Sequence, residues 1–326
     1  MVEINMSEIP IKTDPCPLES LNPRTLFNDM RLILTLSSSF LLIILGWVQC
    51  GLCAEFEDAL GRKITLEGQP QRIISLAPSI TETLYYLGLE DRVVGVTQFS
   101  YYPPEAALKP KVGSYVDVNV ERILTLSPDL VIGTMDGNEA EKVYLLEEAG
   151  IAVFVVNPRN VRQAVETVAT VGHVCGISEK GAALSLQLSK RVDDIIAKTR
   201  GRKKPLVFLQ INLKPIMTVN RNTYIHDLIQ LAGGENLAKD EPITYPRISL
   251  EEVIRRKAEV IIISSMDRGG QFEEAKLEWQ RWTTIPAVKN KRVHLIDSDL
   301  VDRPSPRIVE GLEMIARLLH PEAGWE

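Results

Sequence analysis

Residues 179–200 read EKGAALSLQLSKRVDDIIAKTR, and this stretch decides how the rest of the chain can fold. Its apolar side chains recur at three- and four-residue steps and so form one stripe along an α-helix: Leu184, Leu188, Val192, Ile195 and Ile196. No glycine or proline interrupts the pattern after Gly181. We therefore expect a helix over residues 180–199. It would span roughly 27 Å at 1.5 Å per residue, about the width of a small domain, and could join two domains.

Both flanks of this helix alternate short β-branched apolar runs with amphipathic helices, the pattern of layered α/β domains. Strands are expected at residues 72–76, 93–96, 129–132, 152–156, 206–211, 259–263 and 292–296. We predict an α/β fold of two Rossmann-like lobes joined by a single long α-helix, with a ligand cleft between the lobes. The alternative is an ordinary surface helix within one continuous sheet. Because one stiff helix joins the lobes, we expect little hinge motion.

The chain of 326 residues is long enough for two such lobes. We assign the N-terminal α/β lobe to residues 55–177, the bridging helix to residues 178–201 and the C-terminal α/β lobe to residues 202–326.

Residues 32–54 carry no charge, Arg31 precedes them and small residues end the run, so we assign residues 30–54 to a secretory signal peptide. Residues 1–29 are net acidic, which does not suit the start of a signal, and we interpret them as a leader or a mistaken start. Cleavage near Cys53 or Ala54 would release an exported mature protein. A lipid anchor and an uncleaved membrane anchor are the alternatives.

Capping residues predict where two helices near the expected cleft begin. Ser79 and Glu82 have the spacing of a capping box, which would open a helix that ends at Gly88. Ser305 is expected to cap the last helix, with Pro306 at its first helical position.

A short pattern recurs once in each predicted lobe. Asn119 is followed by Glu121 and then a strand, and Ser249 is followed at the same spacing by Glu251 and a strand. A carboxylate in the first turn of a helix is favoured by the helix dipole by about 0.3 to 1 kcal/mol, which suffices to explain either glutamate alone. The occurrence of one in each lobe suggests a two-point docking surface.

Residues 97–113 form an aromatic, proline-rich loop that includes Phe99, Tyr101 and Tyr102. The loop follows the strand at residues 93–96. Ligands bind at the carboxyl ends of strands in open α/β sheets, so we expect this loop at the ligand site.

No motif in the sequence indicates enzyme chemistry. Only Cys175 lies beyond the presumed signal, so no disulfide is expected, and the four histidines lack metal-ligand spacing. His226 and Asp227 are adjacent in a helical pattern and are interpreted as a surface pair. We expect no enzyme activity, no metal site and no cofactor. The net charge of −6 without a basic cluster argues against a nucleic-acid partner, and we expect a monomer.

Several motifs between residues 72 and 320 carry a family resemblance: RIISLAPSITE, VGVTQFSYYPPE, VGSYVDVNVERILTLSPDLVI, KPLVFLQ, LAGGEN, IPAVKNKRV and RPSPRI. In these motifs the chain resembles the periplasmic substrate-binding proteins of ABC importers for cobalamin and ferric siderophores, and its cobalamin-binding members most. That family has lobes joined by a single rigid helix and binds metal chelates.

The resemblance implies roles for individual residues. It implies ligand contacts from five of them: Phe99, Tyr115, Tyr245, Asp299 and Arg303. It also implies that Glu121 and Glu251 meet arginines of the transmembrane permease subunits. Positions that are tryptophan in the cobalamin binders are Tyr115, Thr134 and Tyr245 here, and a phenylalanine is Met217.

The function implied is that of a receptor that captures a corrinoid (cobalamin) between its lobes and delivers it to an ABC importer. Aromatic walls suit a large, flat, mostly apolar disc with an amide fringe. One alternative is a ferric siderophore or haem, for which Arg247, Arg303 and Arg307 could supply positive charge. Another is an α/β metal-chelate enzyme, which would need a cluster of His, Cys or carboxylate groups at the cleft.

Overall fold

Two four-stranded parallel sheets frame the part of the chain that the computed structural model describes, residues 53–264 and 271–325. The first sheet has the order β4-β3-β5-β6, with β3 Ile73–Ser75, β4 Val93–Val96, β5 Leu130–Thr134 and β6 Val153–Val156. The second has the order β10-β9-β7-β8, with β7 Leu206–Gln210, β8 Glu235–Asn236, β9 Val260–Ile263 and β10 Val293–Leu295. Strands buried on both faces and rich in Val and Ile suit parallel sheets covered by helices.

Both sheets have the same topology. In each, the first strand in the sequence is central, the second lies on one side of it, and the third and fourth follow on the other side. The fold therefore consists of two similar α/β lobes, as predicted. The shared topology also explains why the sequence pattern before β5 recurs before β9.

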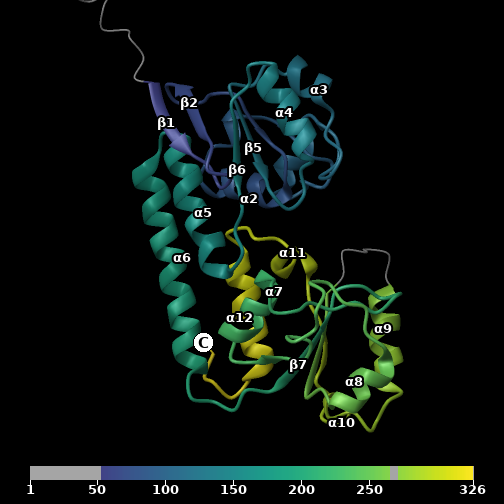
Figure 1. The fold of residues 1–326 in the computed structure, drawn as a ribbon. Coiled ribbons are helices and arrows are strands. Elements are labelled where there is room, and N and C mark those ends of the chain that lie inside the picture. Colours follow the sequence, from purple (N-terminus) through teal and green to yellow (C-terminus); the bar gives the residue numbers. More distant parts are fainter. Residues whose placement is uncertain (1–52, 265–270, 326) are drawn as a thin grey trace, which may run out of the picture. The chain divides into compact units, whose positions relative to one another are not determined.

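Helices cover the sheets of both lobes (Figure 1). Those of the N-terminal lobe are α2 Pro78–Tyr86, α3 Val120–Thr125, α4 Ala140–Glu148 and α5 Val161–Val174. Those of the C-terminal lobe are α7 Tyr224–Leu231, α8 Leu250–Arg256, α9 Gln271–Gln280, α10 Pro286–Lys289, α11 Ser298–Val301 and α12 Ile308–Leu319. Short 3-10 turns occupy Glu90–Arg92 and Pro104–Leu108.

An antiparallel hairpin that the sequence analysis did not anticipate precedes the first sheet. It consists of β1 Cys53–Glu57 and β2 Lys63–Glu67. Residues 53 and 54, the last two of the predicted signal segment, thus belong to β1. The rest of that segment, the predicted leader and two cysteines, Cys16 and Cys50, lie outside the described residues.

The predicted bridging helix is α6 Ser178–Thr199, which runs beside both lobes in Figure 1. Its length of 22 residues corresponds to about 33 Å. Three residues of the predicted apolar stripe, Leu188, Val192 and Ile195, are buried. No helix in the described part of the chain is both long and apolar enough to cross a membrane.

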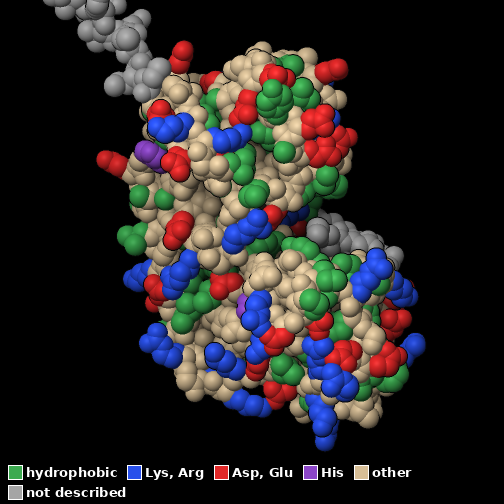
Figure 2. All heavy atoms as spheres, viewed as in Figure 1, with side chains coloured by type: hydrophobic (Ala, Val, Ile, Leu, Met, Phe, Trp, Pro, Cys, Tyr) green, Lys and Arg blue, Asp and Glu red, His purple; other side chains and the backbone are tan. Residues whose placement is uncertain are grey.

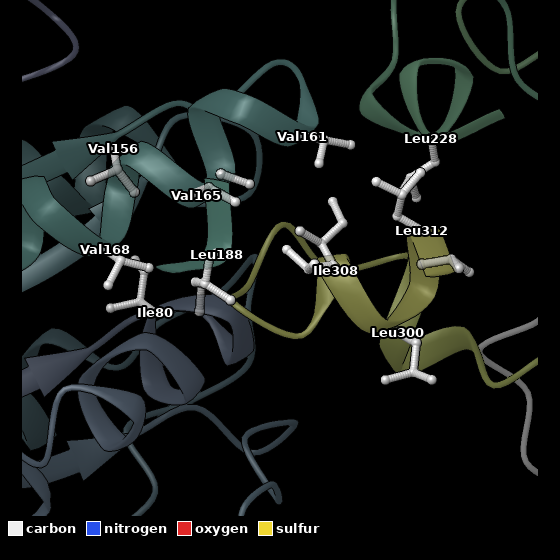
Figure 3. Close-up of a cluster of buried hydrophobic side chains, with 14 of the residues drawn as sticks. Ile80, Val156, Val161, Val165, Val168, Leu188, Leu228, Leu300, Ile308 and Leu312 are labelled. Atoms are coloured by element: carbon white, nitrogen blue, oxygen red, sulfur yellow. The ribbon is translucent and has the colours of Figure 1, made fainter. Parts of the chain in front are cut away.

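One hydrophobic core runs through both lobes. It joins residues of the first sheet and α5 to residues of the second sheet, α7 and α12, with α6 packed along them. Figure 3 shows Ile80, Val165 and Leu188 on the side of the N-terminal lobe and Ile308 and Leu312 of α12 on the other. The lobes are therefore linked by continuous packing as well as by the chain itself.

Two of the predicted helix caps are confirmed. Asn119 accepts a hydrogen bond from the backbone N–H of Arg122 at the start of α3, and Ser249 accepts one from Glu252 at the start of α8. Glu121 is consequently the second residue of α3 and Glu251 the second residue of α8, so the two glutamates occupy equivalent helix starts.

The capping roles predicted for Ser79, Glu82 and Ser305 are wrong. Helix α2 begins two residues earlier than predicted, at Pro78, because proline suits the first helical position, and its N-cap Ala77 makes no side-chain cap. Helix α12 begins later than predicted, after Arg307. The side chains of Glu82 and Ser305 are instead bonded to each other across the two lobes.

We predict that Gly172→Ala destabilises the fold. A Cβ at Gly172 would lie 2.8 Å from the Cα of Gly181, where α5 and α6 approach each other. Overpacking of this kind costs about 1–3 kcal/mol, which exceeds the roughly 1 kcal/mol that alanine gains over glycine inside a helix. Urea unfolding of the mature protein measures the difference. Leu186→Ala on the exposed face of α6 is the control and should change stability little; equal midpoints for Gly172→Ala and the wild type would contradict the prediction.

Candidate functional site

The loop after β4 meets α11 of the other lobe. The Tyr101 hydroxyl donates a hydrogen bond of 2.6 Å to Asp299 Oδ1 and also contacts the Arg303 guanidinium. The loop itself is held by buried hydroxyls, since Thr81 Oγ1 lies 2.9 Å from Ser100 Oγ. This fixed loop brings the aromatic segment of the N-terminal lobe to the carboxyl end of the second sheet.

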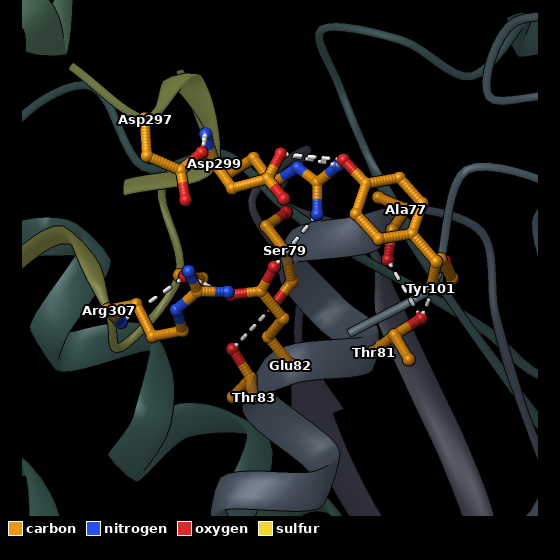
Figure 4. A network of polar contacts seen from close by, with 12 residues as sticks. Ala77, Ser79, Thr81, Glu82, Thr83, Tyr101, Asp297, Asp299 and Arg307 are labelled. Atoms are coloured by element: carbon orange, nitrogen blue, oxygen red, sulfur yellow. Dashed lines mark hydrogen bonds and ion pairs between the residues drawn. The ribbon is translucent and has the colours of Figure 1, made fainter. Parts of the chain in front are cut away.

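Glu82 lies at the centre of the contact between the lobes (Figure 4). Its carboxylate accepts hydrogen bonds from Ser305 Oγ at 2.7 Å and from Arg303 Nη1 at 3.0 Å. Arg307 Nη1 lies 3.9 Å from Glu82 Oε2. A single carboxylate on α2 thus engages three side chains of the C-terminal lobe. We call Glu82, Tyr101, Asp299, Arg303, Ser305 and Arg307 the Glu82 cluster.

The charges of the Glu82 cluster are balanced. Glu82 is 3% exposed, and burial raises the pKa of its carboxyl group, while Ser305 and Arg303 oppose the rise. Arg303 also pairs with Asp299 at 3.0 Å. Two carboxylates therefore face two guanidinium groups in a region largely shielded from water, where uncompensated charge is costly. The cluster presents polar groups without a net positive charge.

Aromatic rings of the loop after β4 lie against both arginines. The Arg303 guanidinium carbon is 4.6 Å from the centre of the Tyr101 ring, and that of Arg307 is 3.7 Å from the centre of the Tyr102 ring. Arg307 Nη1 is buried and makes no hydrogen bond within the described residues. These contacts hold both guanidinium groups against tyrosine rings of the N-terminal lobe.

A second group of aromatic residues includes Tyr115 of the N-terminal lobe. Tyr115 lies just after the loop that follows β4. Its backbone oxygen accepts a 2.9 Å hydrogen bond from the Asn138 side chain. Its ring lies over Gly137, where a Cβ would be 1.8 Å from the ring. Burial raises the pKa of the Tyr115 phenol, and Thr134 opposes the rise. The position of this ring therefore depends on the absence of a side chain at residue 137.

Tyr115 lies near two tyrosines of the other lobe. Burial raises the pKa of the Tyr224 phenol well above its usual value, and Asp302, Tyr245 and Tyr115 add to the rise in that order. The pKa of Tyr245 is likewise raised by burial, then by Asp136 and Tyr115. Tyr115 of the N-terminal lobe therefore raises the pKa of both tyrosines of the C-terminal lobe.

Asp302 is the carboxyl group of this second region and is partly buried. Tyr224 Oη donates a 2.5 Å hydrogen bond to its backbone oxygen, and Ser264 Oγ donates to its carboxylate at 3.1 Å. Burial raises its pKa to about 7, against the opposing effect of Ser264. Neighbouring Asp299 raises it further.

The structure brings two of the five predicted ligand contacts, Asp299 and Arg303, into direct contact. Asp299 pairs with Arg303, and Tyr115 lies near Tyr245. Phe99 belongs to the same loop as Tyr101 and is 50% exposed, while Tyr245 is 46% exposed. Exposed aromatic rings beside a polar cluster are typical of binding surfaces. On the face shown in Figure 2, hydrophobic and basic side chains occur together where the lobes meet. Their contact with a ligand stays a prediction.

The two predicted docking residues lie outside this region. Glu121 and Glu251 are exposed at the starts of α3 and α8, one in each lobe. Hydrogen bonds from its own backbone N–H and from Ser249 lower the pKa of Glu251. Neither glutamate is among the residues that bond to Glu82, Tyr101 or Arg303. Their proposed contact with a permease stays a prediction.

Sequence reasoning missed Glu82, Tyr224, Asp302 and Ser305 as members of the site. Glu82 and Ser305 carried a signal, but it was interpreted as helix capping. His226 and Asp227 are used within the fold: Asp227 accepts a 2.9 Å bond from the backbone N–H of Val161 at the start of α5, and His226 lies 3.3 Å from Asn236.

A separate pocket of about 240 Å³ opens between α8, α9 and the loop after β7. Trp279, Trp282 and Leu250 contribute to its wall, and its whole lining comes from the C-terminal lobe. The pocket contains none of the predicted ligand contacts, so we place the candidate site at the junction of the lobes instead. Among the described residues, no three His, Cys, Asp or Glu side chains gather as a metal site would require.

Comparisons with known proteins support the two-lobe fold. The family model described as a periplasmic binding protein matches residues 73–300. An uncharacterized ABC transporter substrate-binding lipoprotein of Bacillus subtilis (strain 168) is 31% identical over 273 residues, which are 82% of this chain and 85% of the relative.

Solved structures share the fold. The crystal structure of the periplasmic vitamin B12 binding protein BtuF of Vibrio cholerae aligns with a TM-score of 0.70 at 28% identity, over 78% of this chain and 99% of that one. The apo structure of a periplasmic heme-binding protein from Roseiflexus sp. RS-1 aligns with a TM-score of 0.69 at 26% identity, over 78% and 100% of the two chains. Helical coverage, sheet topology and these alignments confirm the predicted fold class.

We predict that Asp302→Asn makes stability less dependent on pH. The folded pKa of Asp302 is about 7 and the ordinary value is 3.8. Because the folded value is the higher one, the contribution of this group is fully present below pH 3.8 and is lost as the pH rises through 7. The loss amounts to up to about 4 kcal/mol at 1.36 kcal/mol per pKa unit, and asparagine removes it.

Unfolding by urea at pH 4, 5, 6 and 7 measures the effect. The variant should gain stability relative to the wild type steadily across this range. Asp193→Asn, at an exposed ion pair with Arg162, is the control. A difference between Asp302→Asn and the wild type that stays constant from pH 4 to 7 would show that Asp302 does not titrate in this way.

Proposed function

Because the chain belongs to the periplasmic binding protein family, we propose that it is an extracytoplasmic receptor that captures a corrinoid between its lobes and delivers it to an ABC importer. The family model covers most of both lobes, and the relative from Bacillus subtilis is named as a substrate-binding protein of an ABC transporter. The vitamin B12 binding protein of Vibrio cholerae shares the fold over nearly its whole length.

The observation that carries the choice of ligand is the charge balance of the Glu82 cluster. Haem brings two propionate groups, and many ferric siderophores carry a net negative charge, which needs free positive charge. Here Arg303 and Arg307 face Glu82, and Arg303 also faces Asp299. A corrinoid presents a broad apolar face and amide side groups, which suit aromatic walls and paired polar groups. Phe99, Tyr115 and Tyr245 would bury the disc, while Asp299 and Arg303 would orient its amides.

Haem or a ferric siderophore is the second candidate, and one observation favours it. A heme-binding protein from Roseiflexus sp. RS-1 has nearly the same TM-score to this chain as the vitamin B12 binding protein does. Tyrosine can hold haem iron as a phenolate. Burial raises the pKa values of Tyr115, Tyr224 and Tyr245, so a phenolate at any of them would form only together with bound iron.

The role we propose is binding without catalysis. The polar groups at the junction of the lobes are engaged in contacts that hold the lobes and orient a ligand, and the relatives are binding proteins of transporters. No resident cofactor is part of the proposal. Export by the segment at residues 30–54 to the periplasm, as a soluble monomer, is likewise part of the proposal.

We predict that cyanocobalamin binds the purified mature protein with a Kd below about 10 µM, a binding free energy beyond about −7 kcal/mol.

Gly137→Ala should weaken binding because a Cβ would displace the Tyr115 ring, while stability should change little because the ring sits at the end of a flexible side chain. Calorimetric titration and urea unfolding measure the two quantities. Gly150→Ala would strain the backbone, because Gly150 has a φ of +81°, and it is therefore not used as the control. Leu186→Ala on the exposed face of α6 is the control. Absence of corrinoid binding at 10 µM, with tight binding of haemin or a ferric siderophore, would overturn the choice of ligand.

We predict that Glu121→Ala and Glu251→Ala weaken the complex with the permease and leave ligand affinity unchanged. If each carboxylate meets a buried arginine, each loss should cost about 2–5 kcal/mol, and less at a wet rim. Pull-down with the reconstituted importer and ligand titration measure the two effects. Glu166→Ala on exposed α5 surface is the matched control. Wild-type transport by the double variant would refute two-point docking, and so would loss of ligand binding together with transport.

A further inference from the structure

Glu82 lies beside both arginines of the Glu82 cluster, so its negative charge offsets the positive charges of both. Its two oxygens face Arg303 at 3.0 Å, Ser305 at 2.7 Å and Arg307 at 3.9 Å. Asp299, the other carboxylate, pairs with Arg303. Removal of the charge on Glu82 would leave two guanidinium groups and a single carboxylate, so the cluster would change from balanced to cationic.

We propose that Glu82 is a selectivity residue: by engaging Arg303 and Arg307 it makes the junction of the lobes accept neutral chelates and reject anionic ones. The inference rests on the proposed function, because it concerns the same ligand site. It assigns to the N-terminal lobe a residue that controls the charge of groups on the C-terminal lobe.

The physical argument is one of competition. An anionic group of a ligand can pair with Arg303 or Arg307 only if it lies beside the Glu82 carboxylate or displaces it. The first arrangement brings like charges together in a region where water screens them poorly. The second leaves a buried carboxylate without its partners, which is costly. An amide group meets neither penalty, since it can share the remaining donors and acceptors of the cluster.

The arginines are ready to bind an anion once Glu82 is neutral. Arg307 Nη1 is buried without a hydrogen-bond partner within the described residues, and both guanidinium groups are held against tyrosine rings. Such fixed guanidinium groups bind carboxylates well because little conformational freedom is lost. The site therefore holds latent anion affinity that Glu82 suppresses.

Glutamine at position 82 tests this inference with little change in shape. Its amide oxygen can still accept from Ser305 or Arg303, and the core shared by both lobes remains intact. Glu82→Asp is the conservative partner, because it perturbs the geometry of the contacts but keeps the negative charge. Glu147→Gln is the matched control, since Glu147 also pairs with an arginine, Arg62 at 2.6 Å, at the far end of α4.

The experiment measures the Kd of cyanocobalamin, which is neutral overall, and of haemin, which carries two propionates, for the wild type and the three variants. For Glu82→Gln the ratio of the two affinities should move toward haemin by about tenfold or more, corresponding to roughly 1.4 kcal/mol. Glu82→Asp and Glu147→Gln should keep the wild-type ratio, even if Glu82→Asp binds both ligands more weakly.

The outcomes separate the inference from the proposed function. Equal weakening of both ligands by Glu82→Gln would mean that Glu82 only holds the lobes together, and the inference would be wrong. The same holds if Glu82→Asp shifts the ratio as much as Glu82→Gln. If the wild type binds haemin tightly and cyanocobalamin not at all, the choice of a corrinoid as ligand and the selectivity role of Glu82 are both wrong. If the wild type prefers cyanocobalamin and Glu82→Gln keeps the wild-type ratio, the selectivity role alone is wrong.

Discussion

The contact of the buried Glu82 carboxylate with Arg303 and Ser305 is the interaction on which the junction of the lobes depends. A carboxylate that is 3% exposed is tolerated only where partners compensate its charge. Here all of these partners come from the other lobe, more than 200 residues later in the chain. The lobes must therefore keep this relative position for Glu82 to remain satisfied, and the aromatic loop carrying Tyr101 is held in the same arrangement.

Packing reinforces this polar contact. The hydrophobic core continues from the first sheet through α5 and α6 to α12 and the second sheet. Wide separation of the lobes would expose part of this apolar surface to water, at a free-energy cost of about 25 cal/mol per Å². Asp227 adds a further link where it caps the start of α5 from α7. A stiff α6, a shared core and a buried polar cluster together favour small hinge motion. Under the proposed function, ligand selection would then fall to the side chains at the junction rather than to closure of the lobes.

Much of this fold could be predicted from the sequence because its signals are local. The apolar stripe of α6, the buried strands and the caps Asn119 and Ser249 each depend on residues a few positions apart. Glu82 and Ser305 also matched local capping patterns, but their partners are distant in the sequence, and tertiary contacts overrode the pattern. The hairpin at the start of the described chain was missed for a related reason, since the preceding apolar segment dominated the interpretation of those residues.

Three glutamates in this chain follow similar helix-start patterns and yet differ in what they can do. Glu121 and Glu251 are exposed in the first turns of α3 and α8, where water screens their charge and a partner protein can reach them. Glu82 lies in α2 facing the other lobe, where burial raises its pKa and makes its charge matter to every neighbour. Burial, which local sequence does not encode, thus separates a carboxylate suited to docking from one suited to selecting a ligand. Glu82 can set the charge at the junction of the lobes while Glu121 and Glu251 remain accessible to a partner protein. Ligand selection and docking therefore need not interfere with each other.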